Sequence, residues 1–346
     1  MNRAQGNLGS TSRSAGPTLT YEVDPSWPKP LPGKWVFGQL PGVDVHGDNI
    51  VVVNRQDITD EEAETFERAP PIVIFDMAGN VVNTWGDIDT LPIKPERCNI
   101  DHRRNIWITG QQDGMLQKYS WDGELLLQIG QRGVFDSSDG TAKGTPLNSA
   151  KDRFFHPTAV AVDPTNDDIY VSDGYGNRRV VVFDREGRFL RQWGRQASQA
   201  EMMSGVGGLF AEVVHDVKIS NQGLVYVCDR QGDRIQVFDK VGKFQQNIWI
   251  RTGTKELPDP RGTAWTMAFS HDPEQRFLYL MNGRNEEVHI LDHGSGEILA
   301  TFGRAGHQLG AFTHGHGIAV DSRAYVYVSE THTGRRVQRF RPAKDA

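Results

Sequence analysis

The sequence predicts an all-β fold, and three observations lead to this prediction. Short apolar segments with strand character are separated by tight polar turns, as in residues 167–194. Glycine and proline contribute 37 and 17 of the 346 residues, which favours a fold rich in turns over a helical one. A pattern of four such strands recurs six times along the chain. Six antiparallel four-stranded units are typical of a six-bladed β-propeller, which is the architecture we expect.

In each repeat, strand a leads through a polar turn to strand b, and a loop then leads to strand c. A glycine-containing hairpin turn, such as Asp122-Gly123, joins strand c to strand d. No segment shows a sustained helical period. The repeats are spaced by 50 to 62 residues when measured between the first positions of strand a. These positions are Gly42, Glu96, Thr158, His215, Trp265 and His316.

The sixth repeat ends after strand c, because only a few residues follow Arg341. A blade without its outer strand would leave an open sheet edge. Residues 19–25, LTYEVDP, precede the first repeat and have strand character. We expect them to supply the missing strand and close the ring. The predicted organisation is a disordered polar head, residues 1–18, followed by a single propeller domain, residues 19–346.

Composition argues against several classes of partner. The net charge is −6 and basic residues form no long run, so nucleic acid is not expected as a partner. No apolar stretch approaches the roughly 18 residues of a membrane span. The polar N-terminus lacks the apolar region of a secretion signal. Cys98 and Cys228 lie in strand patterns, which indicates buried, reduced side chains. We expect a cytoplasmic protein that acts on a small molecule.

Loop lengths predict which face of the propeller is functional. The d–a connections 131–155, 195–212 and 251–263 are long, and so is the first b–c loop, residues 57–70. In a propeller these connections all lie on one face. Long loops on a rigid scaffold often carry function. The alternative is that they only fill the wedge-shaped gaps between blades.

Three of the strand-a starts carry side chains that bind metals. Glu96, His215 and His316 would point from three blades toward one axis. Two imidazoles and one carboxylate leave an open coordination position, an arrangement of catalytic zinc sites that also suits iron or manganese. The alternative is three solvated polar groups around a water-filled channel.

The turns after strand b form a second predicted ring on the same face. Arg55 and Arg230 each follow an apolar strand, where an unpaired guanidinium is costly unless an anion meets it. The alternative for Arg230 is an ion pair with Asp229. The aligned turns bring together Tyr175, Arg230, His332, Arg284, Gln112 and Arg55. The predicted substrate-binding residues are Arg55, Arg230, Arg284, Trp265, His314 and His332.

With these motifs the chain resembles the peptidyl-α-hydroxyglycine α-amidating lyase family, six-bladed propellers of NHL-type repeats. The resemblance covers roughly residues 35–341 and is densest at HPTAVAVDPTNDDIYVSDGYGNRRVVVF and VYVCDRQGDRIQVF. It implies a lyase that cleaves a carbinolamide to an amide and glyoxylate. It also implies a central zinc on three histidines, a catalytic tyrosine, two arginines and a nearby structural calcium.

Matched motif by motif, the family's tyrosine falls on Tyr175 and its two arginines fall on Arg55 and Arg230. Two of the zinc histidines fall on His215 and His316.

The chain departs from the family pattern in three ways. The third zinc histidine falls on Glu96, which lowers the charge of the site by one and makes a bound metal a weaker Lewis acid. Gly317 stands where the family has an acidic calcium ligand, which argues against a structural calcium. The family's secretory disulfides are absent. These departures predict a relative with the catalytic ring but an altered metal site.

The resemblance implies a divalent metal, with zinc as the expected ion, that binds the hydroxyl of a hemiaminal- or hemiacetal-like carboxylate substrate. Tyr175 would act as a general base or hydrogen-bond the alkoxide, with a pKa depressed by the metal and an arginine. Gly174 and Gly176 are expected to give its turn unusual backbone angles. Arg55 and Arg230 would hold the carboxylate. Two alternatives remain open, a metal-dependent lactonase or esterase and a non-enzymatic NHL binding platform.

Overall fold

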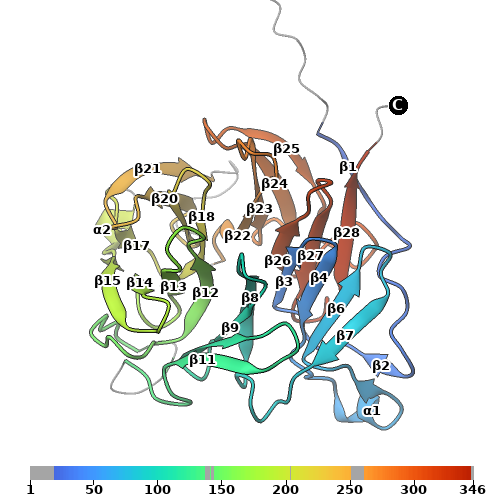
Figure 1. The fold of residues 1–346 in the computed structure, drawn as a ribbon. Coiled ribbons are helices and arrows are strands. Elements are labelled where there is room, and N and C mark those ends of the chain that lie inside the picture. The colour runs from blue at the N-terminus through green and yellow to red at the C-terminus, as the bar shows by residue number, and fades with distance from the viewer. Residues whose placement is uncertain (1–18, 137–140, 142–143, 203, 251–260, 344–346) are drawn as a thin grey trace, which may run out of the picture.

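The computed structural model describes residues 19–136, 141, 144–202, 204–250 and 261–343. Its strands form six four-stranded antiparallel sheets that surround a central axis as blades (Figure 1). The predicted all-β, six-bladed propeller is therefore confirmed. The described part of the chain contains two helices of four residues each, α1 (Asp60–Ala63) and α2 (Gln199–Met202). No helix among the described residues is long and apolar enough to cross a membrane.

In blades 1 to 5 the chain runs from the inner to the outer strand as a simple meander, whereas the outer strand of blade 6 comes from the N-terminal side of the propeller. Blade 1 consists of β3 (Gly42–His46), β4 (Asn49–Val53), β6 (Ile72–Asp76) and β7 (Val81–Trp85). Blade 2 consists of β8 (Pro95–Ile100), β9 (Ile106–Gly110), β10 (Met115–Tyr119) and β11 (Leu125–Ile129). Blade 3 consists of β12 (Pro157–Val162), β13 (Ile169–Asp173), β14 (Arg179–Phe183) and β15 (Phe189–Trp193). Blade 4 consists of β18 (Val214–Ile219), β19 (Val225–Asp229), β20 (Arg234–Phe238) and β21 (Phe244–Trp249). Blade 5 consists of β22 (Ala264–Phe269), β23 (Phe277–Asn282), β24 (Glu287–Asp292) and β25 (Ile298–Phe302). Blade 6 consists of β26 (Gly315–Val320), β27 (Val326–Glu330), β28 (Val337–Pro342) and β1 (Tyr21–Val23).

The core lies between neighbouring blades. The two middle strands of blade 3 are buried at every position, whereas outer strand β15 alternates between partly buried and exposed residues. Tyr170 and Val182 of this blade pack with Val225 and Phe238 of blade 4 in one apolar cluster. Cys98 and Cys228 are buried free thiols, as predicted. Burial raises the pKa of both thiols, so neither is a reactive thiolate.

An N-terminal strand closes the ring, as predicted. Strand β1 pairs antiparallel with β28, with Tyr21 opposite Pro342 and Val23 opposite Phe340. The carboxylate of Asp24 then accepts a hydrogen bond of 2.5 Å from the guanidinium of Arg339. The last blade thus gains the outer strand that its own repeat lacks. The predicted disordered head, residues 1–18, lies outside the described residues.

Acidic residues at the end of strand b fix the loops of the functional face. In blade 3, Asp173 accepts a hydrogen bond from the backbone N–H of Phe155 at 2.9 Å and forms an ion pair with Arg179 at 2.9 Å. The same device recurs in blades 4 and 6, as the pairs Asp229–Arg234 and Glu330–Arg336. Because Asp229 is paired with Arg234, the alternative ion pair between Asp229 and Arg230 does not form.

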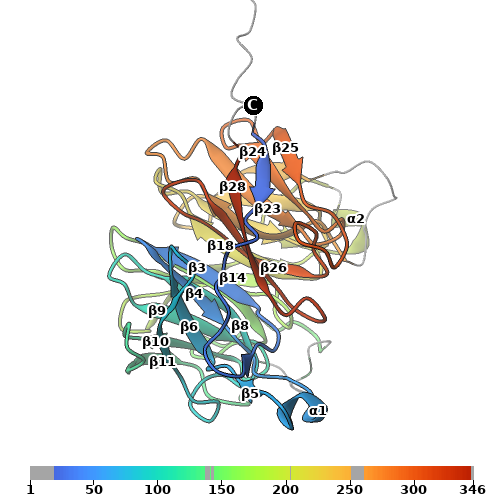
Figure 2. The same ribbon diagram turned by 90° about the vertical axis from the view of Figure 1, so that its right-hand side faces the viewer.

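The long loops contain short elements of their own. Within 195–212, β16 (Arg195–Gln196) pairs in parallel with β17 (Leu209–Phe210). In the first b–c loop, β5 (Glu67–Arg68) pairs in parallel with β2 (Trp35–Val36), which lies between the closing strand and blade 1. Helices α1 and α2 project from the same side of the propeller in Figure 2. Residues 137–140, 142–143, 203 and 251–260 of the predicted long connections lie outside the described residues.

Candidate metal centre and active site

The first positions of strand a reach the channel because the inner strands are bulged. In blades 2 to 6 the register of strand a against strand b skips one residue. The skipped residues are Glu96, Thr158, His215, Trp265 and His316. A β-bulge re-aims the side chain of the extra residue. Strand a of blade 1 pairs with strand b without a bulge and carries Gly42, where an added Cβ would lie 2.8 Å from the backbone nitrogen of Cys98.

Three of these side chains converge, as predicted. Ligand atoms of Glu96, His215 and His316 all lie within 4.8 Å of one another, and all three residues are buried. The Nδ1 atom of His215 lies 2.6 Å from the carbonyl oxygen of Trp265, and that of His316 lies 2.8 Å from the carbonyl oxygen of Pro41. A protonated Nδ1 that donates to a carbonyl leaves the Nε2 lone pair facing the centre, the tautomer that binds a metal.

The charge states of the three groups also suit a metal. Burial lowers the pKa of His215 well below its usual value, and it also lowers the pKa of His316, so both imidazoles are neutral. Burial alone would raise the pKa of Glu96, but its contacts with His316 and Arg55 outweigh burial and hold that pKa well below its usual range, and Arg55 is the partner that remains charged when His316 is neutral. Two neutral nitrogens and one ionised carboxylate fit a divalent metal such as zinc.

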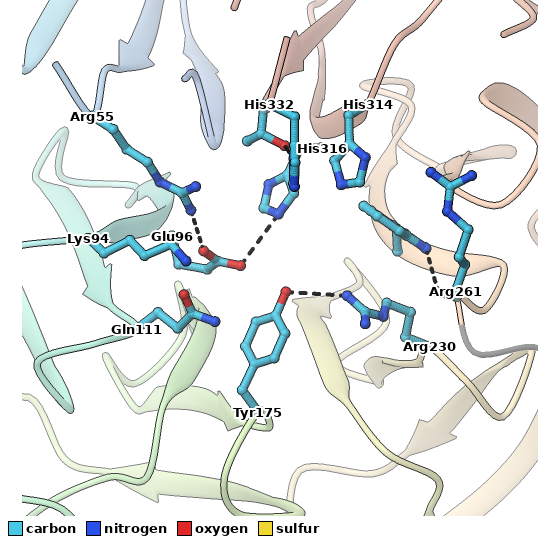
Figure 3. A pocket seen from close by; sticks show the side chains of 12 residues that line it. Arg55, Lys94, Glu96, Gln111, Tyr175, Arg230, Arg261, His314, His316 and His332 are labelled. Carbon is cyan, nitrogen blue, oxygen red and sulfur yellow. Dashed lines mark hydrogen bonds and ion pairs between the residues drawn. The ribbon is translucent and has the colours of Figure 1, made fainter. Parts of the chain in front are cut away.

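Tyr175 lies directly beside this centre (Figure 3). Its phenolic oxygen is 3.1 Å from Nε2 of His215 and accepts a hydrogen bond of 3.3 Å from Arg230. Burial and the nearby Glu96 raise the pKa of the phenol, and Arg230 opposes them only in part. Tyr175 is therefore a neutral phenol among these groups. The depressed pKa expected from the sequence requires a cation in addition to the arginine.

The turn that carries Tyr175 is rigid, although for a different reason from the one predicted. Gly174 and Gly176 are not among the glycines with positive φ, so the expectation of unusual backbone angles is wrong. They are needed for space, because an added Cβ would lie 1.9 Å from the carbonyl oxygen of Val214 at Gly174 and 2.2 Å from the ring of Phe155 at Gly176. Arg178 also donates to the carbonyl oxygen of Gly174 at 2.8 Å. The turn is thus clamped from both sides.

Arg55 is not the unpaired guanidinium that the sequence predicts. It forms an ion pair of 2.6 Å with Glu96, and its Nε and Nη1 atoms donate to the carbonyl oxygen of Pro95 and to Oε1 of Gln39. Arg230 is different. No carboxylate of the described residues forms an ion pair with it, and its Nε is buried without a hydrogen-bond partner. Of the two predicted anion-binding arginines, only Arg230 has no carboxylate partner among the described residues.

A cavity of about 340 Å³ opens over the centre, and ten of its lining residues are labelled in Figure 3. Trp265, His314 and His332 form one wall, with ring centroids 4.8 Å apart for the first pair and 4.0 Å apart for the second. Burial and neighbouring positive charges lower the pKa of His314 to about 3, so this wall is neutral there. Four lining residues were not predicted: Lys94, Gln111, Arg261 and Thr331.

Two predicted rim residues do not line the cavity. Arg284 is absent from its lining because Trp265 fills that place, and an added Cβ at Gly283 would lie 2.2 Å from the indole. Gln112 is exposed, whereas Gln111 lines the cavity. The sequence already contained this signal, since Gln111 aligns with Arg55 and Arg230 when WITGQ, VVVNR and YVCDR are matched residue by residue.

Arg97 is a buried residue that the sequence analysis missed. Its Nη1 atom donates to the carbonyl oxygens of His316 and Pro41. The guanidinium lies 3.5 Å from Nδ1 of both His215 and His316. Among the described residues, no carboxylate forms an ion pair with Arg97. It faces inward because the bulge at Glu96 turns two consecutive residues toward the channel.

Comparisons with known proteins agree with this architecture. The NHL repeat family matches residues 154–183. Peptidyl-glycine alpha-amidating monooxygenase B of Xenopus laevis is 30% identical over 259 residues, which cover 72% of this chain and 26% of that protein. The chain thus spans about a quarter of the length of this relative. The probable peptidyl-alpha-hydroxyglycine alpha-amidating lyase pgal-1 of Caenorhabditis elegans is 23% identical over 317 residues, covering 86% of this chain and 81% of that protein.

Among solved structures, a streptogramin B lyase matches 94% of this chain and 88% of its own, with a TM-score of 0.54 at 11% identity, which shows the fold alone. Fold and repeats together define the class of this protein, a six-bladed NHL-repeat propeller. Its predicted resemblance to the peptidyl-α-hydroxyglycine α-amidating lyases is confirmed, at 23 to 30% identity. The names of these relatives point to an enzyme.

Proposed function

We propose that this protein is a metal-dependent lyase that cleaves a small α-hydroxylated carboxylate of the hemiaminal or hemiacetal type. One observation carries the proposal. The ligand atoms of Glu96, His215 and His316 converge within 4.8 Å, and the phenol of Tyr175 lies 3.1 Å from Nε2 of His215. Glu96, His316 and the proton-carrying Tyr175 line one cavity, and His215 lies buried directly behind the phenol. A metal site and a proton-carrying group at one cavity are what elimination from a hydroxylated carbon requires.

The charges of the cavity favour an anionic substrate. Four cationic side chains line it, against a single carboxylate, that of Glu96. The cations are Arg55, Lys94, Arg230 and Arg261. Arg230 lines the cavity and forms an ion pair with no carboxylate of the described residues, so it is the residue assigned to the substrate carboxylate. The aromatic wall of Trp265, His314 and His332 would then contact the leaving portion of the substrate.

Glu96, His215 and His316 would hold the metal through Oε1 and the two Nε2 atoms. A divalent ion held there would polarise the substrate hydroxyl and lower its pKa. With Nε2 of His215 engaged as a ligand, the phenol of Tyr175 would no longer donate to it, and its proton would be available to the substrate.

In the proposed reaction the hydroxyl loses its proton and its oxygen forms a carbonyl with the α-carbon. The bond from that carbon to nitrogen or oxygen breaks, and the leaving atom keeps the electron pair and takes a proton from Tyr175. Tyr175 recovers the proton that the hydroxyl released. The products are an amide or alcohol and an aldehyde acid, with no water consumed, so the reaction is an elimination and not a hydrolysis.

The proposal is tested with N-acyl-α-hydroxyglycines of increasing acyl size and a parallel panel of lactones. The protein is purified without chelator and its metal content is measured. We expect release of glyoxylate together with the amide, loss of activity on chelation and recovery on adding zinc. Lactone hydrolysis without glyoxylate release would support the hydrolase alternative and overturn the lyase. Absence of both activities and of bound metal would support the binding platform.

A further inference from the structure

We propose that Arg55 is a positioning residue for the metal centre, which restricts Glu96 to one coordinating oxygen and offsets its charge. This inference rests on the metal site of the proposed function. It assigns to Arg55 a role other than the substrate clamp expected from the sequence.

The geometry divides the two oxygens of Glu96 between different partners. Oε2 lies 2.6 Å from Nη2 of Arg55, and Oε1 lies 3.4 Å from Nε2 of His316. Both side chains of the ion pair are buried, with 8% of Arg55 and 2% of Glu96 exposed. A charge-assisted hydrogen bond in such a place is short and strong. Only Oε1 is therefore left for a metal.

Arg55 is itself fixed by two further contacts. Its Nε donates to the carbonyl oxygen of Pro95 at 3.0 Å, and its Nη1 donates to Oε1 of Gln39 at 3.1 Å. Gln39 is held in turn by Asp57, which accepts hydrogen bonds of 2.7 Å from its backbone N–H and 2.6 Å from its side-chain amide. Turning Arg55 toward a substrate would break all of these contacts and leave Glu96 buried without its partner.

The ion pair also affects the net charge at position 96, where the family has a histidine. A neutral imidazole carries no charge, and a carboxylate paired with a guanidinium carries none in sum. The resemblance places an arginine at the position of Arg55 in the family as well, so the site still carries one positive charge less than a site with three histidines. Within this site, Arg55 cancels the charge of the Glu96 carboxylate and weakens it as a donor to a metal.

The test compares Arg55→Met with the unaltered protein in two backgrounds, native Glu96 and Glu96→His. Zinc affinity is measured by chelator competition, and the visible absorption of the cobalt-substituted protein reports the coordination number. With Glu96 present, Arg55→Met frees Oε2, so zinc binds about tenfold more tightly or better, because a buried opposing charge is removed and a second donor is gained. The cobalt absorption weakens as the carboxylate becomes bidentate.

In the Glu96→His background, residue 96 has no carboxylate oxygen to free. Arg55→Met therefore raises the zinc affinity by a smaller factor there and leaves the cobalt spectrum unchanged. Arg230→Met is the matched control, because it removes a guanidinium of the same cavity that forms no hydrogen bond or ion pair with Glu96. This control leaves the cobalt spectrum as it was.

Equal changes in both backgrounds, weaker zinc binding by Arg55→Met, or a constant cobalt spectrum would overturn the inference while leaving the metal site intact. An unaltered protein that binds no zinc would instead overturn the proposed function and this inference together. Thermal unfolding of each variant confirms that the propeller is folded.

Discussion

The phenolic oxygen of Tyr175 lies 3.1 Å from Nε2 of His215, so the turn after β13 meets the bulged residue of β18 at the centre of the propeller. The turn is clamped by the close contacts of Gly174 and Gly176, which hold the phenol in this place. A connecting turn with no chemical role would not require a phenol there, since a phenylalanine fills the same space.

We predict that Tyr175→Phe lowers kcat by about 10²-fold, the range typical of a lost general acid or base. Zinc content should stay constant, because the phenol is not assigned as a ligand. Steady-state kinetics of glyoxylate release and metal analysis check this prediction. A Tyr175→Phe enzyme with the kcat of the unaltered protein would show that the hydroxyl is idle.

Replacing Arg230 should mainly weaken substrate binding. Arg230→Ala removes a guanidinium that lines the cavity and forms an ion pair with no carboxylate of the described residues, so KM should rise about tenfold or more, as expected for a lost charge-assisted hydrogen bond. Arg284→Ala is the control, because Arg284 does not line the cavity. If both variants change KM equally, the assignment of Arg230 as the substrate clamp is wrong.

Gly176→Ala should destabilise the protein by about 2 kcal/mol, because its Cβ would lie 2.2 Å from the ring of Phe155. Gly294→Ala is a matched control, since its Cβ would make only an ordinary contact of 3.5 Å with Asp292. Urea unfolding of the two variants measures the difference. Equal stabilities would mean that the Tyr175 turn adapts to the added methyl group.

Asp24, directly after the closing strand β1, makes the free energy of unfolding depend on pH. Burial alone would raise the pKa of Asp24, but hydrogen bonds from Ser26 and Arg339 outweigh it and lower the pKa from 3.8 to about 2. Ionised Asp24 therefore stabilises the fold fully above a pH of about 4, and this contribution is lost as the pH falls toward 2. Asp24→Asn should be less stable than the unaltered protein at pH 7, with the difference vanishing near pH 2. Urea unfolding across this range that shows a constant difference would contradict the prediction.

The repeat pattern alone predicted the fold and its closure. Alternating strands, tight turns and the missing last strand are local features, and each blade repeats them. The three candidate ligands could also be predicted, because Glu96, His215 and His316 occupy equivalent positions of strand a. Equivalent positions in a propeller face the same axis, so repeat alignment is enough to bring them together.

What the sequence did not predict depends on contacts between blades. The ion pair of Arg55 with Glu96 joins blades 1 and 2 and has no counterpart in the repeat. Arg97 faces the channel only because a bulge precedes it, and a bulge does not show in the alternation of apolar residues. Lys94 and Arg261 enter the cavity from loops, whose paths the repeats do not fix.

The central claim is that Glu96, His215 and His316 hold a catalytic metal. The most direct test is metal analysis of the chelator-free protein beside His215→Ala and His316→Ala, with circular dichroism to confirm the fold. We predict about one divalent ion per chain in the unaltered protein and its loss in both folded variants, since each leaves only two of three ligands. A protein without stoichiometric metal, or variants that retain it, would contradict the account.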